Sequence, residues 1–146
     1  MRKAILDDFD TTDVVIMSAA VSDYRPSEYS SVKIKKVEQK MTISLSRNVD
    51  ILSDLGDRKG PDQILVGFAA ETENLIENAT IKLRQKNCDF VVANPVGTSA
   101  NGAGIDSDEN QGVLLAATGQ QTILPRSKKI DMARKIFDEL LRQRPV

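Results

Sequence analysis

The chain has 146 residues, in which 20 Lys and Arg oppose 21 Asp and Glu for a formal net charge of −1. A charge this close to zero does not attract a polyanion, and four Phe, two Tyr and no Trp leave few rings for stacking on bases, so we expect no nucleic-acid partner. The absence of histidine excludes Ser-His-Asp and Cys-His catalysis, and the single cysteine, Cys88, excludes an internal disulfide.

Strand-like and helix-like segments alternate along the first two thirds of the chain. Three apolar runs, at 13–19, 64–69 and 89–93, are typical of buried strands. The segment 41–46 alternates apolar and polar residues, which is typical of a strand with one face exposed to water. The expected elements are a helix at 2–9, strands at 13–19 and 41–46, a helix at 49–57 that ends near Gly56, a strand at 64–69, a helix at 73–87 and a strand at 89–93. This order predicts an α/β fold with an open, Rossmann-like, mostly parallel sheet and helices on both faces.

The remaining third adds a loop, a hairpin and a helix. Residues 98–111 are rich in Gly, Asn, Asp and Ser and are predicted to be a loop, and 112–124 are predicted to form a β-hairpin that turns at Thr118 and Gly119. Each long helix has an apolar stripe at helical spacing. The predicted stripes are Leu75, Ile76, Ala79 and Leu83 in 73–87, and Ile130, Ala133, Ile136, Phe137, Leu140 and Leu141 in 127–143, the latter with i,i+4 pairs Asp131–Lys135, Arg134–Asp138 and Lys135–Glu139.

The segment SAAVSDYRP, residues 18–26, follows the first predicted buried strand. Ser18, Ala19 and Ala20 are small enough for a ligand to approach the backbone, and the carboxyl ends of parallel strands are where ligands bind in such sheets. Asp23 has the chemistry to bind a metal or a ligand hydroxyl. Equally, the alanines can fill a tight helix–sheet contact, and Asp23 can form an Asx turn before Pro26.

Two groups of lysines have the chemistry of an anion site. Lys33 and Lys35 of VKIKK share one side of an extended chain, and Lys82 and Lys86 lie one turn apart on the helix at 73–87. No acidic residue stands four positions before Lys82, so like charges face each other at a cost of a few tenths of a kcal/mol. The alternative is that the first group protects an edge strand and the second is simply solvated.

Three further segments end or begin elements with polar or aromatic residues. Phe68 of GFAAET and Asn94 of VVANPVG lie near strand ends, where an aromatic ring can stack on a ligand, although a core Phe is the more common case. RNVDIL, residues 47–52, enters a short helix whose free N–H groups suit a base edge or an anion, or Asp50 only complements the helix dipole. GIDSDEN lacks most ligands of a Ca²⁺ loop and reads as loop.

These motifs together resemble one family. AAVSDYRP, KIKK, RNVDIL, GFAAET, the helix with Lys82 and Lys86, and VVANPV stand in the order and spacing of the phosphopantothenoylcysteine synthetases. In bacteria this family is usually the C-terminal half of a bifunctional coenzyme A biosynthesis flavoprotein. The resemblance covers essentially all 146 residues. It implies a ligase that joins 4′-phosphopantothenate to cysteine through an acyl-cytidylate, with CTP as substrate and Mg²⁺ as cofactor.

The resemblance also assigns roles to residues. It places Ala20 near the pantothenate arm, and it makes Lys33 the catalytic residue that neutralises phosphate charge while the cytidylate forms. Backbone recognition of cytosine falls to 49–52. The residues that it assigns to CTP are Met17, Ser18, Ala19, Asp23, Lys33, Val49, Asp50, Ile51, Leu52, Phe68, Lys82 and Lys86. It assigns no flavin to this chain and no reaction to Cys88, and it implies a cytoplasmic homodimer without a membrane or nucleic-acid partner.

The chain departs from the family pattern in three places. Ser22 stands where Ala is more common, Val49 replaces the usual proline, and nothing matches the family's Gly/Thr-rich opening or its S-N-x-S-S-G-x-M-G motif. We therefore expect residues 1–146 to form one domain that lacks an N-terminal β–α–β region. Either the chain is a fragment of a complete enzyme, which we expect to bind CTP weakly and to fail at the second step, or it acts with a partner that supplies the missing part. The alternative of a different class is a non-catalytic CTP-binding module.

Overall fold

The computed structural model describes residues 1–35, 40–97 and 107–143, and its largest element is a five-stranded sheet. The strand order is β1-β4-β5-β6-β7, with β1, β4 and β5 parallel and the last two strands added antiparallel. The elements are α1 (Arg2–Asp8), η1 (Phe9–Thr11), β1 (Val14–Met17), β2 (Tyr24–Pro26), β3 (Leu45–Arg47), α2 (Ile51–Arg58), β4 (Ile64–Glu71), α3 (Leu75–Gln85), β5 (Phe90–Pro95), β6 (Glu109–Ala116), β7 (Gln121–Lys128) and α4 (Lys129–Arg142). This arrangement confirms the predicted open α/β sheet.

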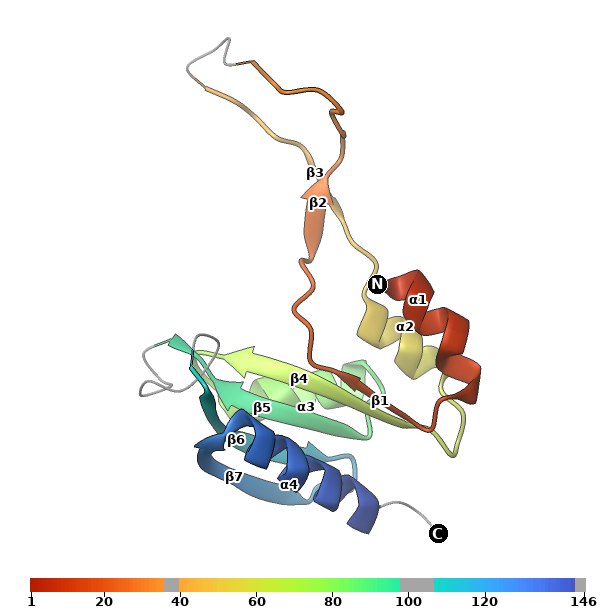
Figure 1. Cartoon of the computed structure of the whole chain (residues 1–146), viewed down its shortest axis with the longest axis vertical. Coiled ribbons are helices and arrows are strands. Elements are labelled where there is room, and N and C mark those ends of the chain that lie inside the picture. Colours follow the sequence, from red (N-terminus) through yellow and green to blue (C-terminus); the bar gives the residue numbers. More distant parts are fainter. Residues whose placement is uncertain (36–39, 98–106, 144–146) are drawn as a thin grey trace.

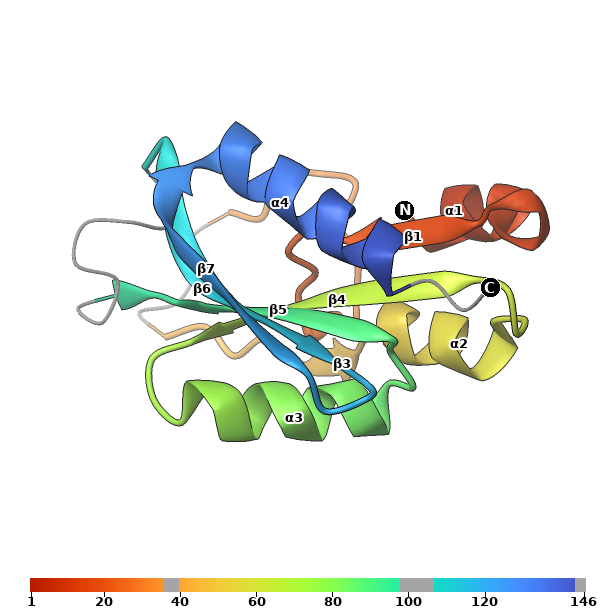
Figure 2. The ribbon, with the colours of Figure 1, turned by 90° about the horizontal axis from the view of Figure 1, so that it is seen from below.

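Helices cover both faces of the sheet, with α2 and α3 on one side and α4 on the other (Figure 2). Side chains alternate between the two faces along a strand. Thus Leu65 of β4 packs in the core that includes Leu55 and Leu83, whereas Val66 packs in the core that includes Ile136 and Leu140. Because both faces of β4 and β5 are covered, their sequences are continuous apolar runs. No helix in the described ranges is long and apolar enough to cross a membrane.

The predicted strand at 41–46, with one face exposed to water, is wrong in extent and in its expected burial. Only Leu45–Arg47 form β3, which pairs antiparallel with β2 in a separate two-stranded sheet. The chain between β2 and β3, described except for 36–39, continues outward as a long arm that projects from the body (Figure 1). The alternating pattern of 41–46 has no sheet to face here, and its side chains are mainly exposed.

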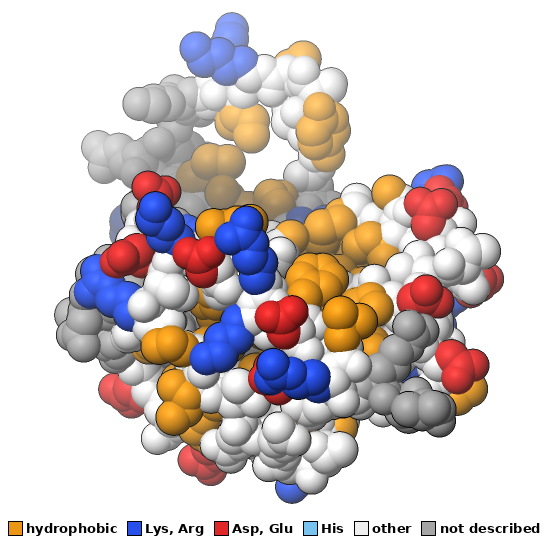
Figure 3. Space-filling view, turned by 60° about the horizontal axis from the view of Figure 1, so that its bottom comes forward, with side chains coloured by type: hydrophobic (Ala, Val, Ile, Leu, Met, Phe, Trp, Pro, Cys, Tyr) orange, Lys and Arg blue, Asp and Glu red, His pale blue; other side chains and the backbone are white. Residues whose placement is uncertain are grey.

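The apolar stripe predicted for α4 is wrong for half of its members. Ile136 and Leu140 are buried, but Ile130, Phe137 and Leu141 are 50% or more exposed. The buried face instead includes Met132 and Glu139, which lie at helical spacing with Ile136 and Leu140. Figure 3 shows the face that carries α4, where exposed hydrophobic side chains gather among charged ones.

The charges on α4 also pair differently from the prediction. Arg134 binds Asp131 at 3.0 Å and Arg142 binds Glu139 at 2.8 Å, both at i,i+3, while the Lys135 ammonium donates to the carbonyl of Ile123. The β7 carbonyl thus draws Lys135 toward the sheet. The predicted hairpin is confirmed, because Gly119 has φ of +91° and donates to Ala116 O across the turn.

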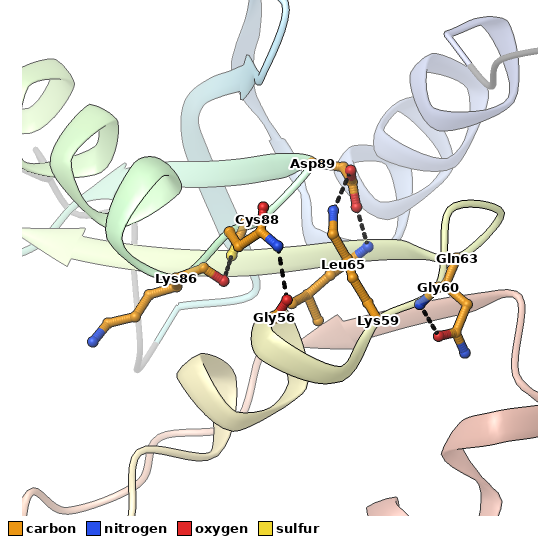
Figure 4. Close-up of polar contacts among 9 residues, drawn as sticks. Gly56, Lys59, Gly60, Gln63, Leu65, Lys86, Cys88 and Asp89 are labelled. Atoms are coloured by element: carbon orange, nitrogen blue, oxygen red, sulfur yellow. Dashed lines mark hydrogen bonds and ion pairs between the residues drawn. The ribbon is translucent and has the colours of Figure 1, made fainter.

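Gly56 does not end α2, contrary to the prediction, but lies buried inside the helix. A Cβ on Gly56 would lie 1.9 Å from the carbonyl oxygen of Lys86, so glycine is required by the close approach of α2 to the end of α3. Close to this contact, Asp89 accepts from the Lys59 ammonium at 2.5 Å and from the Leu65 N–H at 2.7 Å (Figure 4). These bonds fix the helix ends against β4 and β5.

Candidate functional site

One cleft of about 160 Å³ lies beyond the carboxyl end of β1 and beside Phe68 of β4. Its walls are the segment after β1 and the segment that leads from β3 into α2, and α3 closes it from the side. It brings together ten of the thirteen residues that the sequence assigned to the site. These are Met17, Ala19, Asp23, Val49, Asp50, Ile51, Leu52, Phe68, Lys82 and Lys86. Segments distant in sequence therefore meet at the edge of the sheet where ligands bind in such folds.

A larger cavity of about 750 Å³ adjoins this cleft on the α4 side of the sheet. Ser18, Ala19 and Ala20, the small residues predicted to lie near the ligand, all line this cavity. Met17, Ala19 and Phe68 line both spaces, so the two are continuous around the end of β1. The arrangement offers room for a ligand longer than a mononucleotide.

Asp50 is the N-cap of α2 and has both carboxylate oxygens in use. Oδ1 accepts from the Ser53 N–H at 2.9 Å, and Oδ2 pairs with Lys86 at 2.8 Å. Partial burial raises the pKa of Asp50, but the bonds from Lys86 and Ser53 and the charges of Lys86 and Lys82 outweigh it, so the pKa is held below 3.8. Asp50 is therefore an anion in the wall of the cleft, and the N–H groups of residues 51 and 52 have no intrahelical acceptor at the start of α2.

Lys82 and Lys86 each have a partner that the sequence did not reveal. The Lys82 ammonium donates to the carbonyl of Phe68, within β4, at 2.6 Å, and Lys86 is paired with Asp50. The predicted like-charge repulsion is thus relieved by tertiary contacts. Both side chains still line the cleft, where one carbonyl and one carboxylate hold two positive charges in place.

Asp23 and Lys33 occupy very different settings. Asp23 lies exposed on the wall after β1, and within 1–35, 40–97 and 107–143 no side chain pairs with its carboxylate. Lys33 lies on the arm and lines neither cavity beside the sheet. Lys35 and Lys40 share the arm, and Lys36 lies outside the described residues.

Sequence reasoning missed Asn48 and Arg47, which line the cleft together with Val21 and Ser22. Asn48 donates from Nδ2 to the carbonyl of Ser22 and from its backbone N–H to the carbonyl of Asp23, at 2.7 Å each. The motif RNVDIL contains Asn48, but no local sequence pattern indicates its hydrogen bonds to Ser22 and Asp23, which lie far away in the sequence.

The residues that the structure describes contain no group of three or more Cys, Asp and Glu able to hold a metal ion. Mg²⁺ commonly keeps several waters and is held by one or two carboxylates together with substrate phosphates. The exposed carboxylate of Asp23 at the cleft fits that mode of binding. A protein cage for Mg²⁺ does not fit the described residues.

Comparison with known proteins relates the chain to proteins of coenzyme A biosynthesis. The coenzyme A biosynthesis bifunctional protein CoaBC of Bacillus subtilis is 44% identical over 140 residues, which cover 96% of this chain and 34% of that protein. CoaBC of Mycobacterium tuberculosis strain H37Rv is 40% identical over 141 residues, covering 90% and 33%. The chain therefore spans about a third of the length of these curated relatives.

Solved structures show the same fold. A crystal structure of the C-terminal domain of CoaBC matches with a TM-score of 0.73 and 35% identity, covering 95% of this chain and 58% of the other. A mutant of Cab2 in complex with phosphopantothenate-cysteine matches with a TM-score of 0.63 at 18% identity, covering 90% and 44%, which shows a common fold. The model of one family matches residues 1–143. The chain belongs to the DNA/pantothenate metabolism flavoprotein C-terminal domain family.

Proposed function

We propose that this chain is the nucleotide-binding part of a CTP-dependent ligase of coenzyme A biosynthesis, which joins 4′-phosphopantothenate to cysteine. The observation that carries the proposal is the cleft beyond the end of β1, which is lined by ten residues that the family motifs assign to the site. The relatives named as coenzyme A biosynthesis proteins support the pathway.

The proposed reaction has two steps. A carboxylate oxygen of 4′-phosphopantothenate attacks the α-phosphorus of CTP, the bond from that phosphorus to the bridging oxygen breaks, and pyrophosphate leaves. The amine of cysteine then attacks the acyl carbon, loses a proton, and releases CMP as the amide forms. Transfer at phosphorus needs mainly positioning and charge neutralisation, which lysines supply without histidine.

The cleft suggests how the substrates lie. The backbone of 49–52 faces the base at the start of α2, and Phe68 packs against the nucleotide. Lys82 offsets negative charge on the phosphates from its place above the Phe68 carbonyl. The adjoining cavity, which reaches Ser18 and Ala20, takes the pantothenate arm. Mg²⁺, when bound, neutralises triphosphate charge, with Asp23 as the carboxylate that this chain offers.

Lys33 enters this scheme from the arm. We propose that the chain acts as a homodimer and that Lys33 neutralises phosphate charge after the arm closes or when it reaches the cleft of a second copy. Exposed hydrophobic side chains along the arm and in the two strands at its base support an association of this kind; they are Tyr29, Val32, Ile34, Met41 and Ile43 on the arm, with Tyr24 of β2 and Leu45 of β3. Arms that pair would remove this apolar surface from water.

The decisive experiment incubates the chain with CTP, Mg²⁺, 4′-phosphopantothenate and cysteine, and follows pyrophosphate, CMP and the amide separately. Release of pyrophosphate that depends on phosphopantothenate supports the proposed first step. Binding of CTP without pyrophosphate supports the second candidate, a CTP-binding module that needs a further segment or partner chain. A chain that neither binds CTP nor releases a product refutes the proposal.

A further inference from the structure

Asn48 ties together the two walls of the cleft. One wall is the segment after β1, residues 18–23, and the other is 47–52, which leads from β3 into α2. The carboxamide of Asn48 donates to Ser22 O at 2.7 Å, and the backbone N–H of Asn48 donates to Asp23 O at 2.7 Å. Two bonds from one residue therefore connect the walls on the side of the arm.

The third contact of Asn48 anchors the base of the arm. Arg25 Nη1 donates to Asn48 Oδ1 at 2.8 Å, and the pairing of β2 with β3 ends at Tyr24 and Arg47, immediately before Asn48. The amide thus uses its oxygen for the arm and its nitrogen for the cleft wall. A carboxamide is suited to this double role, because it offers a donor and an acceptor on one planar group.

We infer that Asn48 is a positioning residue that holds the cleft walls at a fixed separation and thereby sets the affinity for the nucleotide, an inference that rests on the proposed function for its ligand. Asn48 acts through residues 22 and 23 and not by a charge of its own. Its bonds reach their backbone carbonyls, so the geometry is independent of the side chain at 22. This accounts for the presence of Ser22 where the family more commonly has Ala.

The substitution Asn48→Asp separates the two roles of the amide. A carboxylate keeps the acceptor for Arg25 and strengthens that contact by charge, but it cannot donate to Ser22 O and places two acceptors against each other. Asn48→Ala removes both side-chain bonds and leaves the backbone bond to Asp23 O, and Arg25→Gln removes the guanidinium contact with Asn48. Asn78→Ala is the matched control, because Asn78 is also half-buried and also donates to a backbone carbonyl, that of Glu73, but does not line the cleft.

The first measurement needs no ligand. Hydrogen exchange of the backbone amides in 18–25 and 47–52 is expected to speed up in Asn48→Asp and Asn48→Ala, and to stay as in the wild type in Asn78→Ala. The second measurement is the Kd for CTP by calorimetry, expected to rise about tenfold in both Asn48 variants and to change less than twofold in Arg25→Gln and Asn78→Ala. The melting temperature of the Asn48 variants should shift no more than that of the control, which separates positioning from loss of stability.

The outcomes are distinguishable. Unchanged exchange in both Asn48 variants overturns the inference, and so does faster exchange with an unchanged Kd for CTP. A loss of affinity in Asn48→Ala and Arg25→Gln but not in Asn48→Asp also overturns it, because the arm contact would then carry the effect. A wild-type chain that binds no CTP refutes the proposed function, while faster exchange confined to the Asn48 variants still supports the connection between the walls.

Discussion

Lys86 Nζ lies 2.8 Å from Asp50 Oδ2, and this ion pair joins the end of α3 to the start of α2 at the cleft. The pair forms between residues 36 positions apart, because Gly56 lets the two helices approach closely enough for their ends to meet. Lys86, which the sequence presented as free to bind an anion, therefore already has an ion-pair partner within the protein. Any phosphate in the cleft shares Lys86 with Asp50.

Lys86→Met is expected to raise the pKa of Asp50. That pKa is held below 3.8 in the wild type, so the carboxylate stabilises the fold at neutral pH and loses this contribution as pH falls through its folded value. Without Lys86 the loss sets in at a higher pH. The pair is partly exposed and screened, so the cost in stability at pH 7 is no more than about 1 kcal/mol. Titration of the Asp50 carboxyl by NMR checks the direction, and a pKa lower than in the wild type would contradict it.

Lys33→Ala should reduce formation of the cytidylate far more than Lys40→Ala. Both lysines lie on the arm, so the two variants remove the same charge from the same segment. Initial rates of pyrophosphate release at saturating CTP measure the difference. Equal effects would show that the arm lysines act only as general positive charge.

The sequence was informative where a local pattern has one structural meaning. The apolar runs of β4 and β5 could be assigned because strands buried on both faces are continuously apolar. The cleft residues were found because the small residues and the RNVDIL motif stand at element ends, and parallel strands bring such ends together. These are properties of neighbours in sequence or of the fold class.

What could not be predicted depends on partners distant in sequence. Nothing near Lys82 indicates that its ammonium donates a hydrogen bond to the carbonyl of Phe68. Nothing near Gly56 indicates that the Lys86 carbonyl fills the place of a side chain. A glycine near the end of a helical pattern usually marks the end of the helix, so the sequence predicted that α2 ends at Gly56. The glycine is instead required by the close packing of α2 against the end of α3. On α4, the apolar stripe predicted that Phe137 is buried, but Phe137 is half exposed.

Gly56→Ala is expected to destabilise the fold by about 3 kcal/mol or more, because the added Cβ collides with backbone that cannot rotate away. Gly60→Ala is the matched control, since its Cβ would have only Gln63 Oε1 nearby, at 3.7 Å. Urea unfolding measures both. Similar stabilities for the two variants would contradict the contact between α2 and α3.

Ile34→Asp together with Ile43→Asp should convert the proposed dimer to a monomer, because both side chains are exposed on the arm and a buried unpaired carboxylate is costly. Ile123→Asp is the control, since Ile123 is 73% exposed on β7, outside the arm. Sedimentation equilibrium at several concentrations gives the mass. A wild-type monomer at all concentrations, or dissociation by Ile123→Asp alone, would refute the role of the arm.

Cys88 makes stability fall at alkaline pH. Burial raises the pKa of the thiol to about 11 from 9.0, so between these values the unfolded chain loses the thiol proton while the folded chain retains it. Ionisation then favours unfolding, and the free energy of unfolding drops by about 1 kcal/mol between pH 9 and pH 10. Urea unfolding at pH 8, 9 and 10 should show this drop in the wild type and its loss in Cys88→Ala, which removes the thiol and leaves the other titrating groups. If the free energy of unfolding of the wild type and of Cys88→Ala changes equally with pH, the prediction is wrong and the thiol is in contact with water.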